Sequence, residues 1–480
     1  MSVSRITSVR RALCAIGLAL TLPLALIPPA SARELDRSVP PAPGPPPKVQ
    51  AAPYARFELP NGLRVFVVES RELPLVSVTL TLDRRPPLER DKVGTGALTG
   101  ELLRRGTTTR TRSELDRAID QIGATISTGA TSIGGTALRR HAETLVDLIA
   151  DMALRPSFAV DELRRLKRRT EGTLRSNTGV ADEIARNVVR SAFYGPGHPL
   201  GESATPPSVR AISLDDIRGY HRTYFRPNVA YLTVVGDVSA DEARALAETH
   251  FSGWERAPVP SETYPFPEPP EATRVHVAQR PGAVQTLLQI GHTIPLVPSS
   301  EDYLPALVMR QILGGSGGRL FLRLREREGL TYGSYARLSQ SRELAAIVAS
   351  ANVRTDVTRQ AVDSAIEVLR SVRDERVGED ELARAKAFLS GAYALSLERP
   401  ETSAEQAVDT ALYGLPDDFY STYLDRIARV TADEVQAAAN KYLLPDRLHI
   451  VAVGDAAAIE TALSDLGEIN EYDAYGRPTD

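Results

Sequence analysis

The seven histidines of this chain are the residues best suited to hold a catalytic metal ion, but their spacing argues against such a site. They are His141, His198, His221, His250, His276, His292 and His449. No two lie four residues apart, the spacing that places two imidazoles on one face of a helix. A catalytic zinc ion needs about three protein ligands and an open position for water. The sequence therefore predicts no zinc cofactor in this chain.

The single cysteine, Cys14, lies in a segment that is typical of a secretory signal. Three arginines precede an apolar run at residues 12–27, and small residues at positions 30–32 follow it. We expect residues 1–32 to be removed, which leaves no thiol chemistry or disulfide in a periplasmic or secreted protein. An uncleaved membrane anchor is the alternative, although prolines interrupt the apolar run. We therefore expect no stable membrane insertion.

Charge and composition exclude several classes of function. The 480 residues carry a net charge of -4, and 42% are hydrophobic, so a large buried core is expected. Residues 164–169 are the most basic stretch, but they follow two acidic residues, and Leu163, Leu166 and Leu174 lie in and around them, which predicts a solvated helix face. No basic run is long enough to follow a phosphate backbone. The sequence thus predicts no nucleic-acid partner.

An internal repeat divides the chain. Two segments, Tyr224-Phe-Arg-Pro227 and Tyr442-Leu-Leu-Pro445, each precede an apolar strand that ends in Gly-Asp. A constant offset of 218 residues relates Ile217 to Val435, Tyr224 to Tyr442, Pro227 to Pro445, Gly236 to Gly454, Asp237 to Asp455 and the helix N-caps Ser213 and Thr431. This constant offset predicts that the chain contains two copies of one domain.

Proline-rich segments give the expected domain boundaries. We expect a signal peptide at residues 1–32, a proline-rich tether at 33–53, a first lobe at 54–256, a linker at 257–272, a second lobe at 273–465 and a tail at 466–480.

The pattern within the first copy favours an α+β fold. Residues 57–67 and 76–83 have strand character, are joined by the Asn61-Gly62 turn signal and a proline-containing bend, and are expected to pair antiparallel. A helix is expected from an N-cap at Ser113 to Gly123, and Leu145, Leu148, Ile149 and Met152 mark another. We predict two homologous lobes, each a mainly antiparallel sheet covered by helices, that form a two-lobed shell.

Several motifs follow one another in a fixed order along the chain. They are Leu59-Pro-Asn-Gly-Leu63, Phe193-Tyr-Gly-Pro-Gly-His-Pro-Leu-Gly201, Tyr224-Phe-Arg-Pro-Asn228 with Val235-Gly-Asp237, and Leu324-Arg-Glu-Arg-Glu-Gly-Leu-Thr-Tyr332. Together they resemble the inverted-zinc peptidase family of pitrilysin, insulysin and the mitochondrial processing peptidase. The resemblance covers residues 57–459 and implies two lobes that enclose a chamber where an extended peptide is cut.

The family's zinc helix is altered in this chain. The segment at residues 94–107 matches the helix that bears His-x-x-Glu-His, but Ala97 and Glu101 replace the two histidines and Gly100 replaces the glutamate. Glu171 lies in the helix where the family has its third ligand. The resemblance implies that this chain has no catalytic residues of its own and that zinc belongs to a partner subunit. We expect Glu101 to pair with an arginine one turn on, Arg104 or Arg105.

The second lobe keeps two residues that resemble the family's substrate clamp. Arg325 and Tyr332 have the family's seven-residue separation, and their donors would hold a substrate carbonyl. The alternative is that Arg325 is one of several charged surface residues in the run 323–328 and that Tyr332 is an ordinary aromatic residue of a strand. The glycines at residues 314–318 resemble the family's turn before this helix, not a phosphate-binding loop, because no Lys-Ser or Lys-Thr follows.

A run of small residues at 124–130 resembles the family's edge strand for substrate peptide. Backbone pairing would bind peptide with little sequence preference. The family often has asparagine here, where this chain has serine and threonine, so only backbone pairing is implied; an ordinary sheet edge is the alternative. The implied substrate-binding residues are Ala124, Thr125, Ile126, Ser127 and Thr128.

These features favour a non-catalytic subunit of a periplasmic zinc metallopeptidase complex. We expect a heterodimer with a zinc-bearing homologous subunit, to which this chain supplies substrate-clamping residues for proteolysis of extended peptides. One alternative is a stand-alone peptide-binding or scaffold protein of the same fold. Another is an independent metallopeptidase with unusual ligands, including Glu101.

Overall fold

The computed structural model describes residues 51–479, which belong to one compact unit. The expected signal peptide and most of the expected tether therefore lie outside the described residues. Within the described part, no helix is both long enough and apolar enough to cross a membrane.

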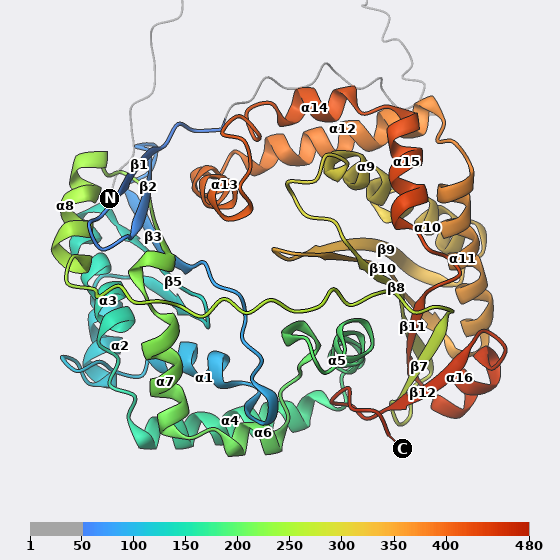
Figure 1. The fold of residues 1–480 in the computed structure, drawn as a ribbon, viewed down its shortest axis with the longest axis horizontal. Coiled ribbons are helices and arrows are strands. Elements are labelled where there is room, and N and C mark those ends of the chain that lie inside the picture. Colours follow the sequence, from blue (N-terminus) through green and yellow to red (C-terminus); the bar gives the residue numbers. More distant parts are fainter. Residues whose placement is uncertain (1–50, 480) are drawn as a thin grey trace, which may run out of the picture. The chain divides into compact units, whose positions relative to one another are not determined.

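The first sheet is six-stranded and mainly antiparallel (Figure 1). Only the contact between its second and third strands is parallel. Its order is β1 (Ala55–Glu58), β2 (Arg64–Glu69), β6 (Ala230–Gly236), β3 (Leu75–Leu82), β5 (Ser132–Leu138) and β4 (Thr125–Thr128).

The Asn61-Gly62 turn lies between β1 and β2, inside residues 57–67, which the sequence predicts as one strand, and the expected antiparallel pairing of that segment with residues 76–83 is wrong. Strand β6 lies between β2 and β3, parallel to the first and antiparallel to the second. The physical reason is the apolar run of β6, in which six consecutive residues are buried. A strand buried on both faces is stable in the centre of a sheet, where both its edges are hydrogen-bonded.

Helices of the first half, apart from α5, pack apolar side chains against this sheet. They are α1 (Thr95–Leu103), α2 (Arg112–Gln121), α3 (Ala142–Leu154), α4 (Val160–Asn177), α5 (Ala181–Tyr194), α6 (Pro206–Ala211), α7 (Leu214–Tyr224) and α8 (Ala240–Phe251), of which α5 packs elsewhere. The four apolar residues predicted for α3 are all buried. Short 3-10 helices lie at Arg90–Lys92, Arg139–His141, Pro199–Gly201, Pro227–Val229 and Thr355–Val357.

The N-cap of α2 is Thr111, so the predicted cap at Ser113 is wrong. The Thr111 hydroxyl accepts a hydrogen bond from the Glu114 N–H, and the Glu114 carboxylate accepts one from the Thr111 N–H at 2.8 Å. This reciprocal capping box satisfies two helix-terminal donors, whereas the acidic residue three positions after Ser113, Asp116, pairs with Arg112 at 3.7 Å and with Arg104 at 3.9 Å. The predicted end of the helix holds, since Gly123 has φ +60°.

The second sheet is also six-stranded, with three antiparallel contacts and two parallel ones. Its order is β12 (Glu468–Tyr472), β7 (Arg274–Gln279), β11 (His449–Gly454), β8 (Gln285–Ile294), β10 (Ala345–Arg354) and β9 (Thr331–Gln340). Residues 466–480 are thus not a mere tail, because β12 completes the sheet by pairing with β7. The short polar strand gave little sequence signal.

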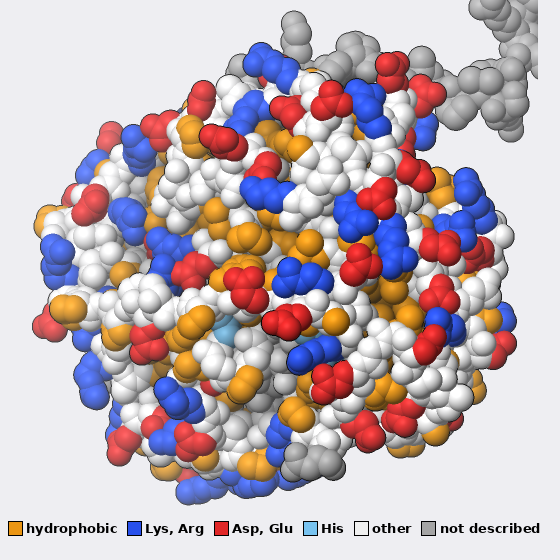
Figure 2. All heavy atoms as spheres, turned by 45° about the vertical axis from the view of Figure 1, so that its right-hand side comes forward, with side chains coloured by type: hydrophobic (Ala, Val, Ile, Leu, Met, Phe, Trp, Pro, Cys, Tyr) orange, Lys and Arg blue, Asp and Glu red, His pale blue; other side chains and the backbone are white. Residues whose placement is uncertain are grey.

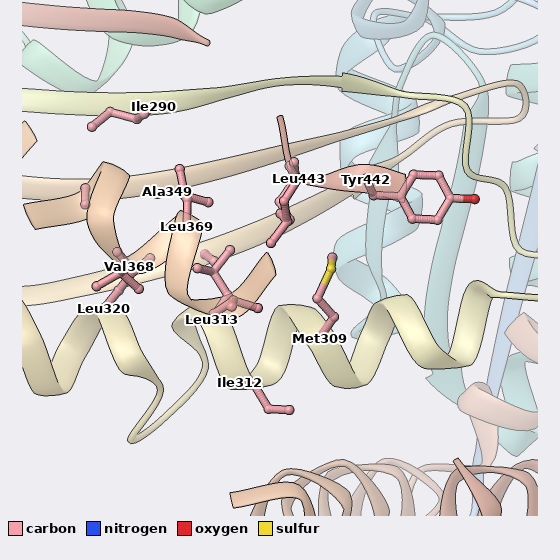
Figure 3. Close-up of a cluster of buried hydrophobic side chains, with 14 of the residues drawn as sticks. Ile290, Met309, Ile312, Leu313, Leu320, Ala349, Val368, Leu369, Tyr442 and Leu443 are labelled. Atoms are coloured by element: carbon pink, nitrogen blue, oxygen red, sulfur yellow. The ribbon is translucent and has the colours of Figure 1, made fainter. Parts of the chain in front are cut away.

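Helices of the second half cover this sheet and form the larger core with it. They are α9 (Tyr303–Gly314), α10 (Arg319–Phe321), a π-helix (Leu322–Arg327), α11 (Thr358–Asp374), α12 (Glu379–Ser396), α13 (Pro400–Tyr413), α14 (Tyr423–Arg429), α15 (Ala432–Tyr442) and α16 (Ala456–Leu463). Figure 3 shows part of the core, where Leu313 of α9 lies with Leu369 of α11 and with Leu443.

The internal repeat is visible in equivalent elements. Helices α7 and α15 have the same length, start 218 residues apart, and begin with capping boxes at Ser213 and Thr431. Each leads to a buried strand, β6 or β11. The predicted fold class, α+β with two homologous lobes of mainly antiparallel sheet covered by helices, is confirmed.

One equivalent pair of helices packs on the other lobe's sheet. From the first lobe, α5 packs against β11 and β8 of the second sheet, through residues that include Ile184 and Val188 (Figure 1). From the second lobe, α13 packs against β2 and β6 of the first sheet, through residues that include Ala404 and Val408. This reciprocal arrangement covers the sheet faces that each lobe's own helices leave open.

Charges of both signs are interspersed on the face seen in Figure 2. The basic stretch of α4 follows the prediction of a solvated helix face: Leu163 and Leu166 are its buried residues, and Arg164 pairs with Asp161. The molecular face drawn in Figure 2 has no continuous basic stripe.

Candidate functional site

Helix α1, the counterpart of the family's zinc helix, is held at its N-terminus by Glu89. The Glu89 carboxylate accepts hydrogen bonds from the backbone N–H groups of Gly94 (2.6 Å), Thr95 (3.1 Å) and Gly96 (2.7 Å). These groups are the orphan donors of a helix start, so the carboxylate replaces a side-chain cap. Burial raises the pKa of Glu89, and the three N–H donors oppose that shift.

The position of the family's glutamate is filled by backbone. A Cβ on Gly100 would lie 2.2 Å from the carbonyl carbon of Gly129, 2.4 Å from its oxygen and 2.6 Å from the nitrogen of Ala130. Those residues form the turn between β4 and β5. Only glycine permits so close an approach. The turn therefore occupies the space through which a glutamate side chain at position 100 would have to extend.

The two carboxylates at expected ligand positions are both engaged by arginines. Glu101 pairs with Arg169 of α4, so the expected pairing with an arginine one turn on in α1 is wrong. The partner comes from a neighbouring helix, which helical spacing cannot reveal. Glu171 pairs with Arg175 at 2.9 Å and with Arg210 at 2.8 Å.

The donor set on α1 does not fit a catalytic zinc ion. Ala97 and Gly100 offer no side-chain donor, and the nearby carboxylates already have cationic partners. Across residues 51–479, no group of three or more His, Cys, Asp or Glu side chains is placed to hold a metal ion. No reaction step through a metal can be assigned to these residues.

The structure brings Arg325 and Tyr332 together. The Arg325 guanidinium carbon lies 5.2 Å from the centroid of the Tyr332 ring and 4.8 Å from that of Phe321. The Tyr332 side chain is 89% exposed, and Arg325 is only partly buried. These contacts are within the range of cation–π attraction, which holds the guanidinium beside the phenol. Both groups remain accessible to a ligand.

Local backbone features position this pair. Arg325 lies in the π-helix, an irregularity frequent at functional sites. Gly329, with φ +63°, turns the chain from the helix into β9, where Tyr332 lies. A Cβ on Gly314 would lie 2.2 Å from the nitrogen of Ala336, so the glycine-rich turn serves close approach of α9 to β9.

Strand β4 is the last strand of its sheet, and its pairing partner in the described chain is β5. It contains four of the five implied peptide-binding residues, and Ala124 precedes it. Arg104, the C-cap of α1, donates a hydrogen bond from Nη1 to the carbonyl oxygen of Ile126 at 3.1 Å. One backbone acceptor of β4 is therefore already engaged. Sequence reasoning missed this contact, which joins α1 to the edge strand.

A cavity of about 700 Å³ lies beside β4, between the first sheet and α13. Sequence reasoning missed it because α13 reaches this sheet from the other lobe. Its sheet wall is rich in hydroxyl groups, and its helix wall carries charged side chains. The sheet wall includes Ser77, Thr79, Thr81, Thr125, Ser127, Ser132, Thr136 and Thr233, and the helix wall includes Arg399, Glu401, Glu405 and Asp409.

One hydrogen bond fastens the two walls of this cavity. The Ser77 hydroxyl donates to Glu401 Oε1 at 3.1 Å. The residues that line the cavity include Thr125, Ile126 and Ser127 of β4, but not Arg325 or Tyr332. The candidate site thus consists of two separate parts, an edge strand with its cavity and an exposed arginine–tyrosine pair.

The chain thus has two homologous lobes, and its helix α1 lacks metal-binding side chains. Residues 211–389 match the family described as the Peptidase M16 inactive domain. This confirms the predicted relationship to the inverted-zinc peptidases.

Individual proteins give the same relationship. An uncharacterized zinc protease of Mycobacterium leprae is 28% identical over 428 residues, which are 86% of this chain and 94% of that protein. A non-peptidase homologue of Helicobacter pylori is 22% identical over 303 residues, 62% of this chain and 69% of its own. The crystal structure of a peptidase M16 inactive domain from Pseudomonas fluorescens has a TM-score of 0.77 at 23% identity, and covers 84% of this chain and 98% of that one. That structure is similar in fold.

Proposed function

We propose that this protein is the non-catalytic subunit of a periplasmic zinc metallopeptidase complex. The observation that carries the proposal is the contrast between its two lobes. In the first lobe, backbone fills the place of the catalytic glutamate at Gly100. In the second, Arg325 and Tyr332 lie together and accessible. A chain that has lost the metal but keeps the substrate donors suits a division of labour between subunits.

The chemistry of the pair is stabilisation, not attack. A guanidinium and a phenol donate hydrogen bonds to a carbonyl oxygen and stabilise the negative charge that develops there during hydrolysis. Neither group supplies the nucleophile. The zinc-bearing homologous subunit supplies the metal, the activated water and the base. The signal-like residues 1–32 support the periplasmic location.

Reconstitution tests this proposal. We expect the purified chain to show no peptidase activity alone, and activity to arise when a zinc-bearing homologue encoded beside it is added. Arg325→Ala should lower kcat/KM of the complex about a hundredfold, the usual loss for one oxyanion donor. Arg327→Ala, in the same π-helix, is the matched control and should leave activity near that of the parent. If the complexes with Arg325→Ala and with Arg327→Ala have equal kcat/KM, Arg325 does not clamp the substrate.

A stand-alone peptide-binding or scaffold protein is the second candidate. The edge strand β4 and its adjoining cavity favour it, because a peptide would pair with backbone there and extend side chains into a hydroxyl-lined space. Peptide binding by the isolated chain, without any effect on the activity of a co-purified peptidase, would select this function. An independent metallopeptidase has no comparable support, since Glu101 is engaged by Arg169.

A further inference from the structure

A smaller cavity, of about 270 Å³, lies in the second lobe on the other side of α13 and has mainly aromatic walls. Ring centroids lie 4.4 Å apart for Tyr393 and Tyr423, and 5.1 Å apart for Phe419 and Tyr420. Aromatic faces carry negative electrostatic potential and attract cations. The aromatic lining residues are Tyr303, Tyr393, Tyr413, Phe419, Tyr420 and Tyr423.

Two carboxylates of α13, Glu405 and Asp409, also line this cavity. Burial raises the pKa of Asp409, and the negative charge of Glu405 adds to the shift, while the Tyr420 hydroxyl opposes it. That hydroxyl donates to Asp409 Oδ2 at 3.3 Å. Glu405 pairs with Arg399 at 3.8 Å, whereas within residues 51–479 no lysine or arginine nitrogen lies within 4.0 Å of the Asp409 carboxylate. Asp409 is half-buried, and a carboxylate withdrawn from water without a cation is costly, so a bound cation would reduce that cost.

A third polar group points to the same missing partner. Gln406, 8% exposed, lines the cavity, and its Oε1 is buried without a hydrogen-bond donor. The Arg426 guanidinium carbon lies 4.8 Å from the centroid of the Phe419 ring, and the charge of Arg310 is felt by Tyr303 and Tyr423. Arg310 donates to Gln311 and makes no ion pair with Asp409. The cavity thus combines a carboxylate that has no lysine or arginine partner, Asp409, and a buried acceptor without a donor, Gln406 Oε1, with rings that favour positive charge.

We propose that this aromatic cavity binds a small alkylammonium cation. Its positive charge would lie against the tyrosine rings and pair with Asp409, and an ammonium N–H, where the ligand has one, would supply the donor that Gln406 Oε1 lacks. The site is independent of peptide cleavage and of the arginine–tyrosine pair. The ligand is either a quaternary ammonium compound or a primary amine, such as the end of a lysine side chain.

Calorimetric titration of the full chain tests the proposal with three probes. These are choline, n-butylammonium and 3,3-dimethylbutan-1-ol, the uncharged isostere of choline. We expect at least one of the cations to bind and the alcohol to bind at least about tenfold more weakly. Preference for choline identifies a quaternary ligand, and preference for n-butylammonium identifies a primary amine. Absence of cation binding at millimolar concentration, or equal binding of the alcohol, would overturn the proposal.

Variants localise the binding. Asp409→Asn keeps the shape of the side chain and should weaken binding of the preferred cation about tenfold, whereas Asp418→Asn, at an exposed carboxylate nearby, should leave it unchanged. Tyr413→Leu removes one ring from the wall and should also weaken it. Unchanged circular dichroism would show that the variants fold. Wild-type affinity in folded Asp409→Asn would contradict the assignment.

Discussion

Replacement of Gly100 by alanine tests whether backbone fills the position of the family's glutamate. The added Cβ would lie 2.2 Å from the carbonyl carbon of Gly129, far inside the 3.4 Å at which ordinary contact begins. The β4–β5 turn must therefore withdraw from α1, or α1 must move. Either movement strains a tightly packed region in which Leu98 and Leu102 of the same helix are fully buried.

Two opposing effects set the size of the change. Alanine in a helix interior is favoured over glycine by about 1 kcal/mol. Overpacking typically costs about 1–3 kcal/mol, and a backbone neighbour cannot rotate away as the end of a side chain can. The clash at Gly100 is with backbone, so the cost lies at the upper end of that range. We expect Gly100→Ala to lower the free energy of unfolding by about 2 kcal/mol.

Urea unfolding, followed by circular dichroism, measures this difference. The control is Gly172→Ala in the exposed middle of α4, where nothing lies within 4 Å of the added Cβ. That variant should gain up to about 1 kcal/mol from helix propensity alone. If Gly100→Ala is as stable as Gly172→Ala, the β4–β5 turn is not packed against α1.

Because the β4–β5 turn lies against position 100, the combined change Ala97→His, Gly100→Glu and Glu101→His should not create a zinc site.

Further changes have equally definite outcomes. Thr111→Ala should lower the free energy of unfolding by about 1 kcal/mol, while Ser113→Ala should change it little in the same urea assay, because only Thr111 caps α2; the reverse order would restore the original assignment of the cap. Burial lowers the pKa of His276 to about 4 and of His449 to about 3. The unfolded chain therefore binds more protons below pH 6.5, so the free energy of unfolding should fall as the pH drops from about 6.5 to 4. The rings of His276 and His449 are hydrogen-bonded to each other at 2.9 Å. His276→Gln should make the free energy of unfolding depend less on pH, and an unchanged dependence would exclude these two histidines as its source.

Local patterns predicted those parts of the fold that depend on neighbouring residues. The turn at Asn61-Gly62, the buried face of α3 and the paired helices α7 and α15 all follow from short-range spacing. The strand order did not follow, because β6 enters between β2 and β3 from about 150 residues further along the chain. Strand β12 was missed for a related reason: short, polar and near the end of the chain, it gains its stability from pairing with β7.

The candidate site divides in the same way. The contact of Arg325 with Tyr332 could be predicted because both residues lie within one short segment. The cavity beside β4 could not, because its second wall is α13 of the other lobe. The sequence shows a glycine at position 100 but not the turn that requires it. That requirement arises from tertiary contact with Gly129.

The zinc content of the purified, solitary chain tests the central claim most directly. After incubation with zinc and gel filtration, elemental analysis should find far less than one zinc ion per chain, and the protein should cleave no peptide. One tightly held zinc ion per chain, together with peptide cleavage that a chelator abolishes, would show that the altered helix α1 still supports catalysis.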